Sequence, residues 1–169
     1  MNRLARLTRH PNTWRLLLIA VAATVVRIVF FQHAPVFFEG DARGYLVRAV
    51  EISTGEGFQF SLKRTPGYPL FMAAVFDAFG TSLEAVVIVQ HLFGVATALL
   101  AYDCARRIAG RTAGLLAGLA TALSGAMLIY EHVILTESLF TLLLVAAIWL
   151  VLVGLSRRSW LLVAAAGAA

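Results

Sequence analysis

Long runs of apolar residues constrain this chain more than any other feature of its sequence. They cover residues 14–31, 83–105, 112–130 and 137–155, and a further run begins at Trp160. A helix needs about 20 mostly apolar residues to cross the hydrocarbon core of a bilayer. We therefore predict an all-α fold, a polytopic membrane helix bundle with four crossing helices and a truncated fifth. We expect residues 1–169 to form the N-terminal part of a single transmembrane domain.

Composition and charge support a membrane protein and argue against a nucleic-acid-binding one. The chain has 169 residues, of which 60% are hydrophobic and 14% are charged, and its pI is near 10.1. Soluble domains are about half apolar and a quarter charged. The basic residues stand at the ends of the apolar runs instead of forming a stripe interleaved with aromatic residues, so we expect no nucleic-acid partner. The one cysteine, Cys104, excludes an internal disulfide and is typical of a small buried apolar residue.

The distribution of arginines orients the predicted helices. Arginines precede the first run, and separate the second from the third and the fourth from the fifth: Arg3, Arg6, Arg9, Arg15, Arg106, Arg107, Arg111, Arg157 and Arg158. These clusters fall on one side, which the positive-inside rule makes cytoplasmic. We expect an integral membrane protein with a cytoplasmic N-terminus. A cleaved signal peptide is the alternative for the N-terminus, but the first run is longer than a signal core.

Small residues recur at four-residue intervals in the third run, at Gly114, Gly118, Ala122 and Ala126. Such a stripe lets two helices approach closely in lipid. It predicts a packing face and implies no chemistry.

The outer loop, residues 32–82, is too long for a simple connection and is expected to contain interfacial or juxtamembrane helices. Asp41 can cap a helix that runs to Ser53 by accepting a backbone N–H in the first turn. A second helix follows Thr65–Pro66 and ends at Gly80. Thr81 and Glu84 have capping-box spacing, which gives Glu84 a structural explanation. We expect the loop to fold back on the membrane and to roof a cavity.

One face of the first loop helix is apolar, and it carries Ala42, Tyr45, Leu46, Ala49 and Val50. Such a helix is expected to lie on the membrane surface or against the other helices.

A second group of ionisable residues lies on the same side as Asp41, in the connection "IYEHVILTE". It contains Glu131, His132 and Glu137, and charged groups at a membrane edge often line polar cavities. Glu137 has an equally good explanation as an acid in the first turn of a helix. Glu131 and His132 are the candidate ligands of a divalent metal cation, Mg²⁺ or Mn²⁺.

Two residues inside the apolar runs are costly in lipid. Arg27 can snorkel to the outer interface, or it can point inward and serve a function, and the sequence leaves both open. His91, beside Gln90, is interpreted as an interhelical hydrogen-bonding residue instead of a ligand.

Four motifs then occur in a familiar order: "EGDARGYLVRA", "RTPGYPLFMAAVFDAFG", "ARRIAGRTAGLLAGL" and "ILTESLF". Together they resemble the N-terminal part of GT-C superfamily glycosyltransferases, nearest to the protein O-mannosyltransferase and lipid A aminoarabinose transferase branch. The resemblance implies an integral enzyme of the bacterial inner membrane, with its active site on the outer face, that takes a sugar from a polyprenyl-phosphate donor on the non-cytoplasmic side. It places a catalytic acid at Asp41 and a second acid at Glu137. Some members have adjacent acids in the first loop, whereas Gly40 separates Glu39 from Asp41 here.

These residues suit glycosyl transfer, which needs a base for the acceptor hydroxyl and positive charge for the departing phosphate. Our hypothesis makes Asp41 the general base, and lets Glu137 position the acceptor or a cation. Arg64 would steady the phosphate with its planar fork. Tyr68, Glu39 and Arg27 are further candidates for substrate binding, and we expect inversion at the sugar carbon.

Plain alternatives remain at these positions. Asp41 can be only a helix cap, and Lys63 and Arg64 can be headgroup anchors.

Two other classes of protein stay open, a polytopic membrane transporter and a catalytically silent scaffold. Transporters interrupt matched helices of repeated halves with Gly or Pro. Here the strongest interruption lies in the outer loop and no second half is visible, which favours the enzyme. The sequence names neither the sugar nor the acceptor.

Overall fold

Helices make up most of the part that the computed structural model describes, which is residues 13–38, 40–57 and 65–167. The helices in chain order are α2 (Thr13–His33), α3 (Ala42–Ser53), α4 (Gly67–Phe79), α5 (Leu83–Ala122), α6 (Gly125–His132), α7 (Glu137–Arg157) and α8 (Trp160–Ala166). No named strand occurs among these residues, and Phe37 and Val133 form an isolated bridge. The all-α prediction is confirmed.

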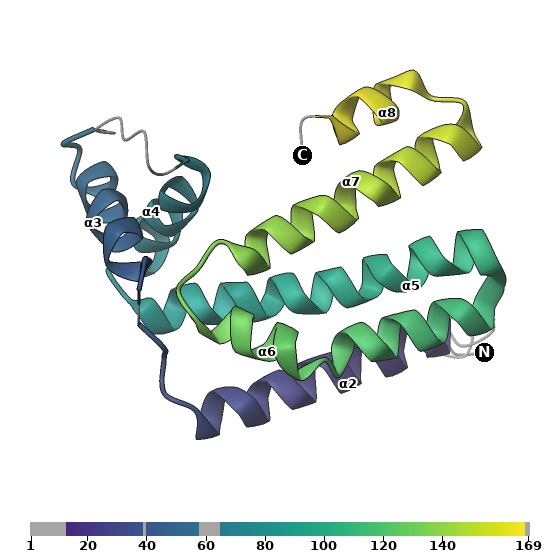
Figure 1. Ribbon diagram of the computed structural model, residues 1–169, viewed down its shortest axis with the longest axis horizontal. Coiled ribbons are helices and arrows are strands. Elements are labelled where there is room, and N and C mark those ends of the chain that lie inside the picture. The colour runs from purple at the N-terminus through teal and green to yellow at the C-terminus, as the bar shows by residue number, and fades with distance from the viewer. Residues whose placement is uncertain (1–12, 39, 58–64, 168–169) are drawn as a thin grey trace, which may run out of the picture.

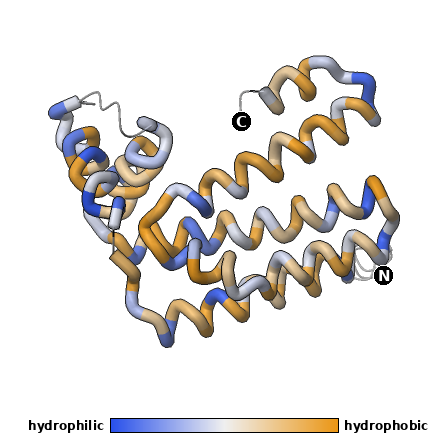
Figure 2. Tube along the Cα trace, viewed as in Figure 1, coloured by the Kyte–Doolittle hydropathy of each residue, from blue (hydrophilic) through white to orange (hydrophobic). Residues whose placement is uncertain are grey.

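Helices α2, α5 and α7 are each long and apolar enough to cross a membrane, and they form the elongated body in Figure 1. The apolar colouring of Figure 2 runs along all three. Helix α5 is two antiparallel helices in one, because the chain reverses at Gly110, where φ is 87° and ψ is 179°. This conformation is essentially restricted to glycine. The second and third apolar runs are therefore the two limbs of a hairpin.

The returning limb of α5 breaks at Leu123–Ser124, and the chain continues as α6. Ser124 caps the new helix by accepting a hydrogen bond from the backbone N–H of Met127 (3.4 Å). As predicted, Gly114, Gly118 and Ala122 are buried, whereas Ala126 is exposed. The prediction for Ala126 was wrong because the break places this residue in a different helix.

Helix α2 packs against both limbs of α5. A buried cluster joins the two helices and consists of Ile19, Ala23, Ala98, Tyr102 and Ala122. A Cβ atom on Gly118 would lie 2.6 Å from Cδ1 of Ile19, so the small-residue stripe does bring the helices together.

Helices α3 and α4 form a separate pair at one end of the body (Figure 1). The predicted apolar face of α3 packs on α4, with Ala42 and Ala49 buried beside Tyr68, Met72 and Phe76. Helix α4 ends at Gly80, where φ is 77°. The side-chain cap predicted for Asp41 was wrong: its side chain makes no capping hydrogen bond, and its backbone carbonyl accepts from the N–H groups of Gly44 and Tyr45.

Ser82, one residue after the predicted Thr81, caps α5. Its hydroxyl accepts a hydrogen bond from the N–H of Ala85 (3.1 Å) and donates one to Glu84 (3.0 Å). The capping box predicted between Thr81 and Glu84 was therefore wrong by one residue, although Glu84 does have a structural partner at the start of α5.

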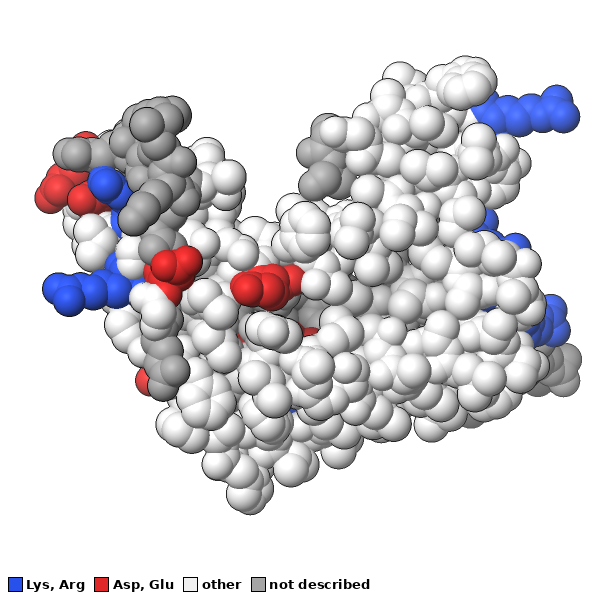
Figure 3. Space-filling view, viewed as in Figure 1, with Lys and Arg blue, Asp and Glu red and all other residues white. Residues whose placement is uncertain are grey.

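Basic residues gather at the end of the body away from α3 and α4. The Gly110 reversal and the α7–α8 turn both lie there, and Figure 3 shows arginine side chains over this end, with further arginines over the end that carries α3 and α4. Asp103 pairs with Arg106 and Arg107 on its own helix and accepts a hydrogen bond from the indole N–H of Trp149 in α7 (2.9 Å). The acidic groups in the same view lie over the opposite half of the molecule.

Candidate functional site: two acidic segments above a buried polar network

The segments that carry the two candidate acids are hydrogen-bonded to each other. The N–H of Phe37 donates to the carbonyl of His132 (3.4 Å), and the N–H of Ile134 donates to the carbonyl of Phe37 (3.3 Å). This makes a parallel bridge between Phe37 and Val133. Asp41 and Glu137 each stand four residues beyond it, at the starts of α3 and α7. Because the bridge is parallel, both segments leave it in the same direction.

His132 lies directly beneath this bridge and is fully buried. Its Nε2 is 3.1 Å from the carbonyl oxygen of Ala34, in the segment that leads to Asp41. A carbonyl only accepts, so Nε2 of His132 carries the proton and donates it. The ring also makes edge-on contacts with Phe30, Phe31 and Phe37. His132 belongs to the segment that leads to Glu137, and it holds the segment that leads to Asp41 at two points, one through its backbone and one through its side chain.

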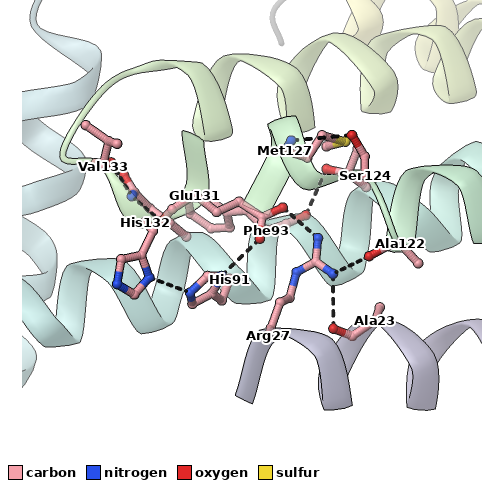
Figure 4. A network of polar contacts seen from close by, with 12 residues as sticks. Ala23, Arg27, His91, Phe93, Ala122, Ser124, Met127, Glu131, His132 and Val133 are labelled. Carbon is pink, nitrogen blue, oxygen red and sulfur yellow. Dashed lines mark hydrogen bonds and ion pairs between the residues drawn. The ribbon is translucent and has the colours of Figure 1, made fainter. Parts of the chain in front are cut away.

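An ion pair in the interior continues this network (Figure 4). Nη2 of Arg27 donates to Oε1 of Glu131 at 2.6 Å, and both side chains are almost completely buried. Nη1 of Arg27 donates to the carbonyls of Ala23 (3.0 Å) and Ala122 (3.2 Å). A Cβ atom on Gly94 would overlap both Glu131 and Arg27, so the pair fits only because position 94 has no side chain.

His91 connects the ion pair to His132. Its Nδ1 is 3.0 Å from Oε2 of Glu131, and its Nε2 is 3.1 Å from Nδ1 of His132. The network thus joins α2, α5 and α6 to the connection between α2 and α3. The interpretation of His91 as an interhelical hydrogen-bonding residue agrees with these contacts.

Gln90 attaches α4 to the same network. Its amide nitrogen donates to the carbonyls of Glu131 (2.8 Å) and Val133 (2.9 Å), and its oxygen accepts a 2.5 Å hydrogen bond from the hydroxyl of Tyr68. Burial raises the pKa of Tyr68 well above its ordinary value, and the negative charge of Glu137 raises it further.

Glu137 is half-buried at the first position of α7. Its carboxylate accepts a long hydrogen bond from the hydroxyl of Thr136 (3.4 Å). It also lines a cavity of about 40 Å³ together with Gly94, Thr97, Met127, Tyr130, Glu131, Ser138 and Thr141. The hydroxyl of Ser138 is buried there without a hydrogen-bond partner. Most of the lining is apolar, but Glu131, Glu137 and Ser138 bring polar groups to it, and the hollow is large enough for a water molecule.

The other predicted site residues fall in different places. Asp41 is exposed at the start of α3, while Glu39, Lys63 and Arg64 lie outside the described residues. Arg27 points inward, which answers the question that the sequence left open, and its Nη atoms are engaged by Glu131 and by backbone carbonyls.

Tyr68 is buried and bonded to Gln90, so its described contacts are structural. Its role in substrate binding stays a prediction. Sequence reasoning missed Gln90 as the amide that joins α4, α5 and α6. Its position next to His91 inside an apolar run was the available signal, because a polar side chain in lipid needs partners.

The predicted metal site has no counterpart here. Both oxygens of Glu131 and both ring nitrogens of His132 already have protein partners. No group of three or more His, Cys, Asp and Glu side chains in the described part of the chain is arranged to hold a metal ion. These residues do not fit a metal as they stand, and we derive no step through one.

A larger, mostly apolar cavity of about 280 Å³ lies between α2 and α5. Ile28, Phe31, Ile88 and Leu92 line it, and Arg27 and His91 of the buried network are among its polar residues. The buried network therefore has a second face, toward this groove.

Comparison with known proteins gives one match. A family model described as dolichyl-phosphate-mannose-protein mannosyltransferase matches residues 63–169, which is well over half of the chain. The searches of curated proteins and of solved structures found no match to the chain.

Proposed function

Because the chain belongs to the dolichyl-phosphate-mannose-protein mannosyltransferase family, we propose that it takes part in sugar transfer from a polyprenyl-phosphate donor to an acceptor hydroxyl. The transfer takes place at the end of the helix body that carries α3 and the start of α7. With the arginine clusters at the cytoplasmic end, this is the outer face of the membrane. The bacterial inner membrane is the location that this proposal adopts.

The parallel bridge between Phe37 and Val133 is the observation that carries the proposal. It makes neighbours of two segments that are far apart in the sequence, and each segment leads to an acid in four residues. The first of these acids precedes the matched region, and the second lies inside it.

Asp41 acts as the general base in this proposal. Its exposed carboxylate can take the proton of the acceptor hydroxyl as that oxygen attacks the anomeric carbon of the sugar. The bond from this carbon to the phosphate oxygen breaks, and the electron pair of that bond stays on the oxygen. The phosphate, still attached to its lipid carrier, is the leaving group. Attack from the face opposite the phosphate inverts the sugar carbon.

Glu137 positions the acceptor, because its carboxylate is half-buried at a helix N-terminus with one long hydrogen bond. Arg64 and Glu39 are assigned to the donor phosphate and to the sugar.

Transfer of radiolabel from polyprenyl-phosphate sugars by the full-length protein in liposomes tests the proposal. A positioned general base contributes about 10²–10⁴ in rate, so Asp41→Asn should lower turnover by at least 10². Asp77→Asn is the matched control, since Asp77 is another exposed acid of the α3–α4 pair and should leave turnover unchanged. Wild-type turnover in Asp41→Asn would exclude this residue as the base. Uptake of sugar into the vesicles without transfer would identify a transporter instead.

A further inference from the structure

We propose that His132 is a positioning residue that fixes the spacing of Asp41 and Glu137. The inference rests on the proposed function for its catalytic consequence, but its structural part can be tested without activity. It assigns to His132 a role other than metal binding. His132 itself does not touch the substrate in this proposal.

The first argument is that His132 is the shared anchor of both acid-bearing segments. Its backbone carbonyl accepts from the N–H of Phe37, and its Nε2 donates to the carbonyl of Ala34. The segment that leads to Asp41 is therefore held at two points three residues apart. The segment that leads to Glu137 begins at His132 itself, five residues before the acid.

The second argument is that the anchor cannot turn or slide. The ring of His132 is fully buried, and three phenylalanines contact it edge-on. Its Nδ1 is 3.1 Å from Nε2 of His91, and Nδ1 of His91 is 3.0 Å from Oε2 of Glu131. Glu131 in turn is paired with Arg27. The buried ion pair thus connects the anchor to α2 and α5, which pack against each other in the helix body.

The third argument is that one isolated bridge joins two segments that are 96 residues apart in the sequence. A single bridge has no neighbouring strand to fix its register. The side chain of His132 supplies the extra hydrogen bond that fixes it, because Ala34 and Phe37 can both reach His132 in only one register. A displacement of about 1 Å between catalytic groups can cost about 10²-fold in rate. Loss of this anchor should therefore displace Asp41 relative to Glu137 and lower the rate of transfer.

Cross-linking gives a readout that is independent of activity. Neighbouring strands lie about 4.8 Å apart, within the Cα separations that a disulfide tolerates. Phe37→Cys with Val133→Cys, in a Cys104→Ala background, should therefore form a disulfide rapidly on mild oxidation. Adding His132→Leu should slow this reaction at least tenfold, whereas His132→Gln should react nearly as fast, because the Gln amide replaces the Nε2–H donor.

Activity measurements then separate positioning from a direct role. His132→Leu should lower kcat by about 10²-fold with little change in the KM of the donor, and His132→Gln should restore most of it. The disulfide between positions 37 and 133 should also restore kcat in the His132→Leu protein, since it holds the two segments by a covalent bond. Trp149→Phe is the matched control: it removes an interhelical hydrogen bond at the other end of the body and should leave kcat unchanged.

Each result decides the proposal. An unchanged cross-linking rate in His132→Leu would overturn it, and so would a loss of kcat that the disulfide cannot restore. If His132→Leu does not fold, His132→Gln and His132→Asn take its place, because Asn cannot reach Ala34 and should behave as Leu does. If even the wild-type protein transfers no sugar, the proposed function fails, while the cross-linking rates still show whether His132 sets the register.

Discussion

Removing the charge of Glu131 is the sharpest test of the buried network. The substitution Glu131→Gln keeps the volume of the side chain and an oxygen that can accept from Arg27. It leaves the guanidinium, which cannot lose its proton in a protein, without a counter-ion at a site where both partners are almost completely buried. The effect therefore isolates charge from shape.

The magnitude follows from the burial of the pair. Breaking a buried ion pair by removing one partner costs about 3–5 kcal/mol. Because the Gln oxygen still accepts one hydrogen bond, we expect the lower end of this range, about 3 kcal/mol. For a domain of this size each kcal/mol lowers Tm by about 2–4 °C, so Glu131→Gln should lower Tm by roughly 6–12 °C.

Cys104 provides the assay. It is the single cysteine of the chain and it is buried, so a thiol-reactive dye reports unfolding in detergent micelles as the temperature rises. The second protein to measure is Arg27→Met with Glu131→Gln, which removes both charges. Replacing a buried pair by neutral side chains of similar volume is often nearly neutral, so the double variant should recover at least half of the lost Tm.

Two results would refute this reasoning. A Tm within about 2 °C of wild type in Glu131→Gln, less than the shift expected for one kcal/mol, would mean that Arg27 has another counter-ion or reaches water. Additive losses in the double variant would mean that the two side chains do not depend on each other.

Three further substitutions test separate features of the fold by the same thermal assay. Gly94→Ala should cost about 1–3 kcal/mol, because a Cβ atom there overlaps the ion pair. Gly67→Ala should be nearly neutral, because a Cβ atom there has nothing within 4 Å. Equal losses of stability in the two variants would contradict the packing at Gly94. Gly110→Ala should cost about 1–3 kcal/mol because φ is 87°, and an unchanged Tm would mean that the hairpin turns in another way. Tyr68→Phe should lose about 1–3 kcal/mol at neutral pH by leaving the buried oxygen of Gln90 without its donor. The pKa of Tyr68 is raised in the folded state, so the contribution of Tyr68 to stability is complete below the unfolded pKa of about 10 and is lost as the pH rises above it. Between about pH 10 and pH 11.5, Tyr68→Phe should therefore lose less stability than the wild type does. Parallel curves of stability against pH for the two proteins would contradict the raised pKa.

The candidate site was predictable in its parts but not in its connections. The acids at Asp41 and Glu137 stand out in sequence because charged residues beside apolar runs are costly. The sequence also singled out Arg27, Glu131 and His132, but it divided them between substrate binding and a metal site. The hydrogen bonds of the structure make them one network with His91 and Gln90. Such contacts join residues that are far apart along the chain, and no local pattern encodes them.

Local chemistry explains where the predictions of helix ends succeeded and failed. Gly80 ends α4 as expected, because glycine readily adopts the positive φ found there. Asp41 and Thr81 were expected to cap helices, yet Asp41 makes no side-chain cap and Ser82 caps α5. Neighbouring residues of equal capping ability differ by small energies, so packing chooses between them.

By itself the sequence determined that this protein is a set of apolar helices, with basic turns at one end and acids at the other. Those features depend on composition along the chain, because the length of an apolar run and the charges at its ends act locally. Only the tertiary structure decided that Arg27 turns inward to Glu131, that the third apolar run breaks into α5 and α6, and that the segments before Asp41 and Glu137 meet at one bridge. These features depend on which helix faces lie against each other, and a buried charge or an unpaired backbone group takes whatever partner that packing brings within reach.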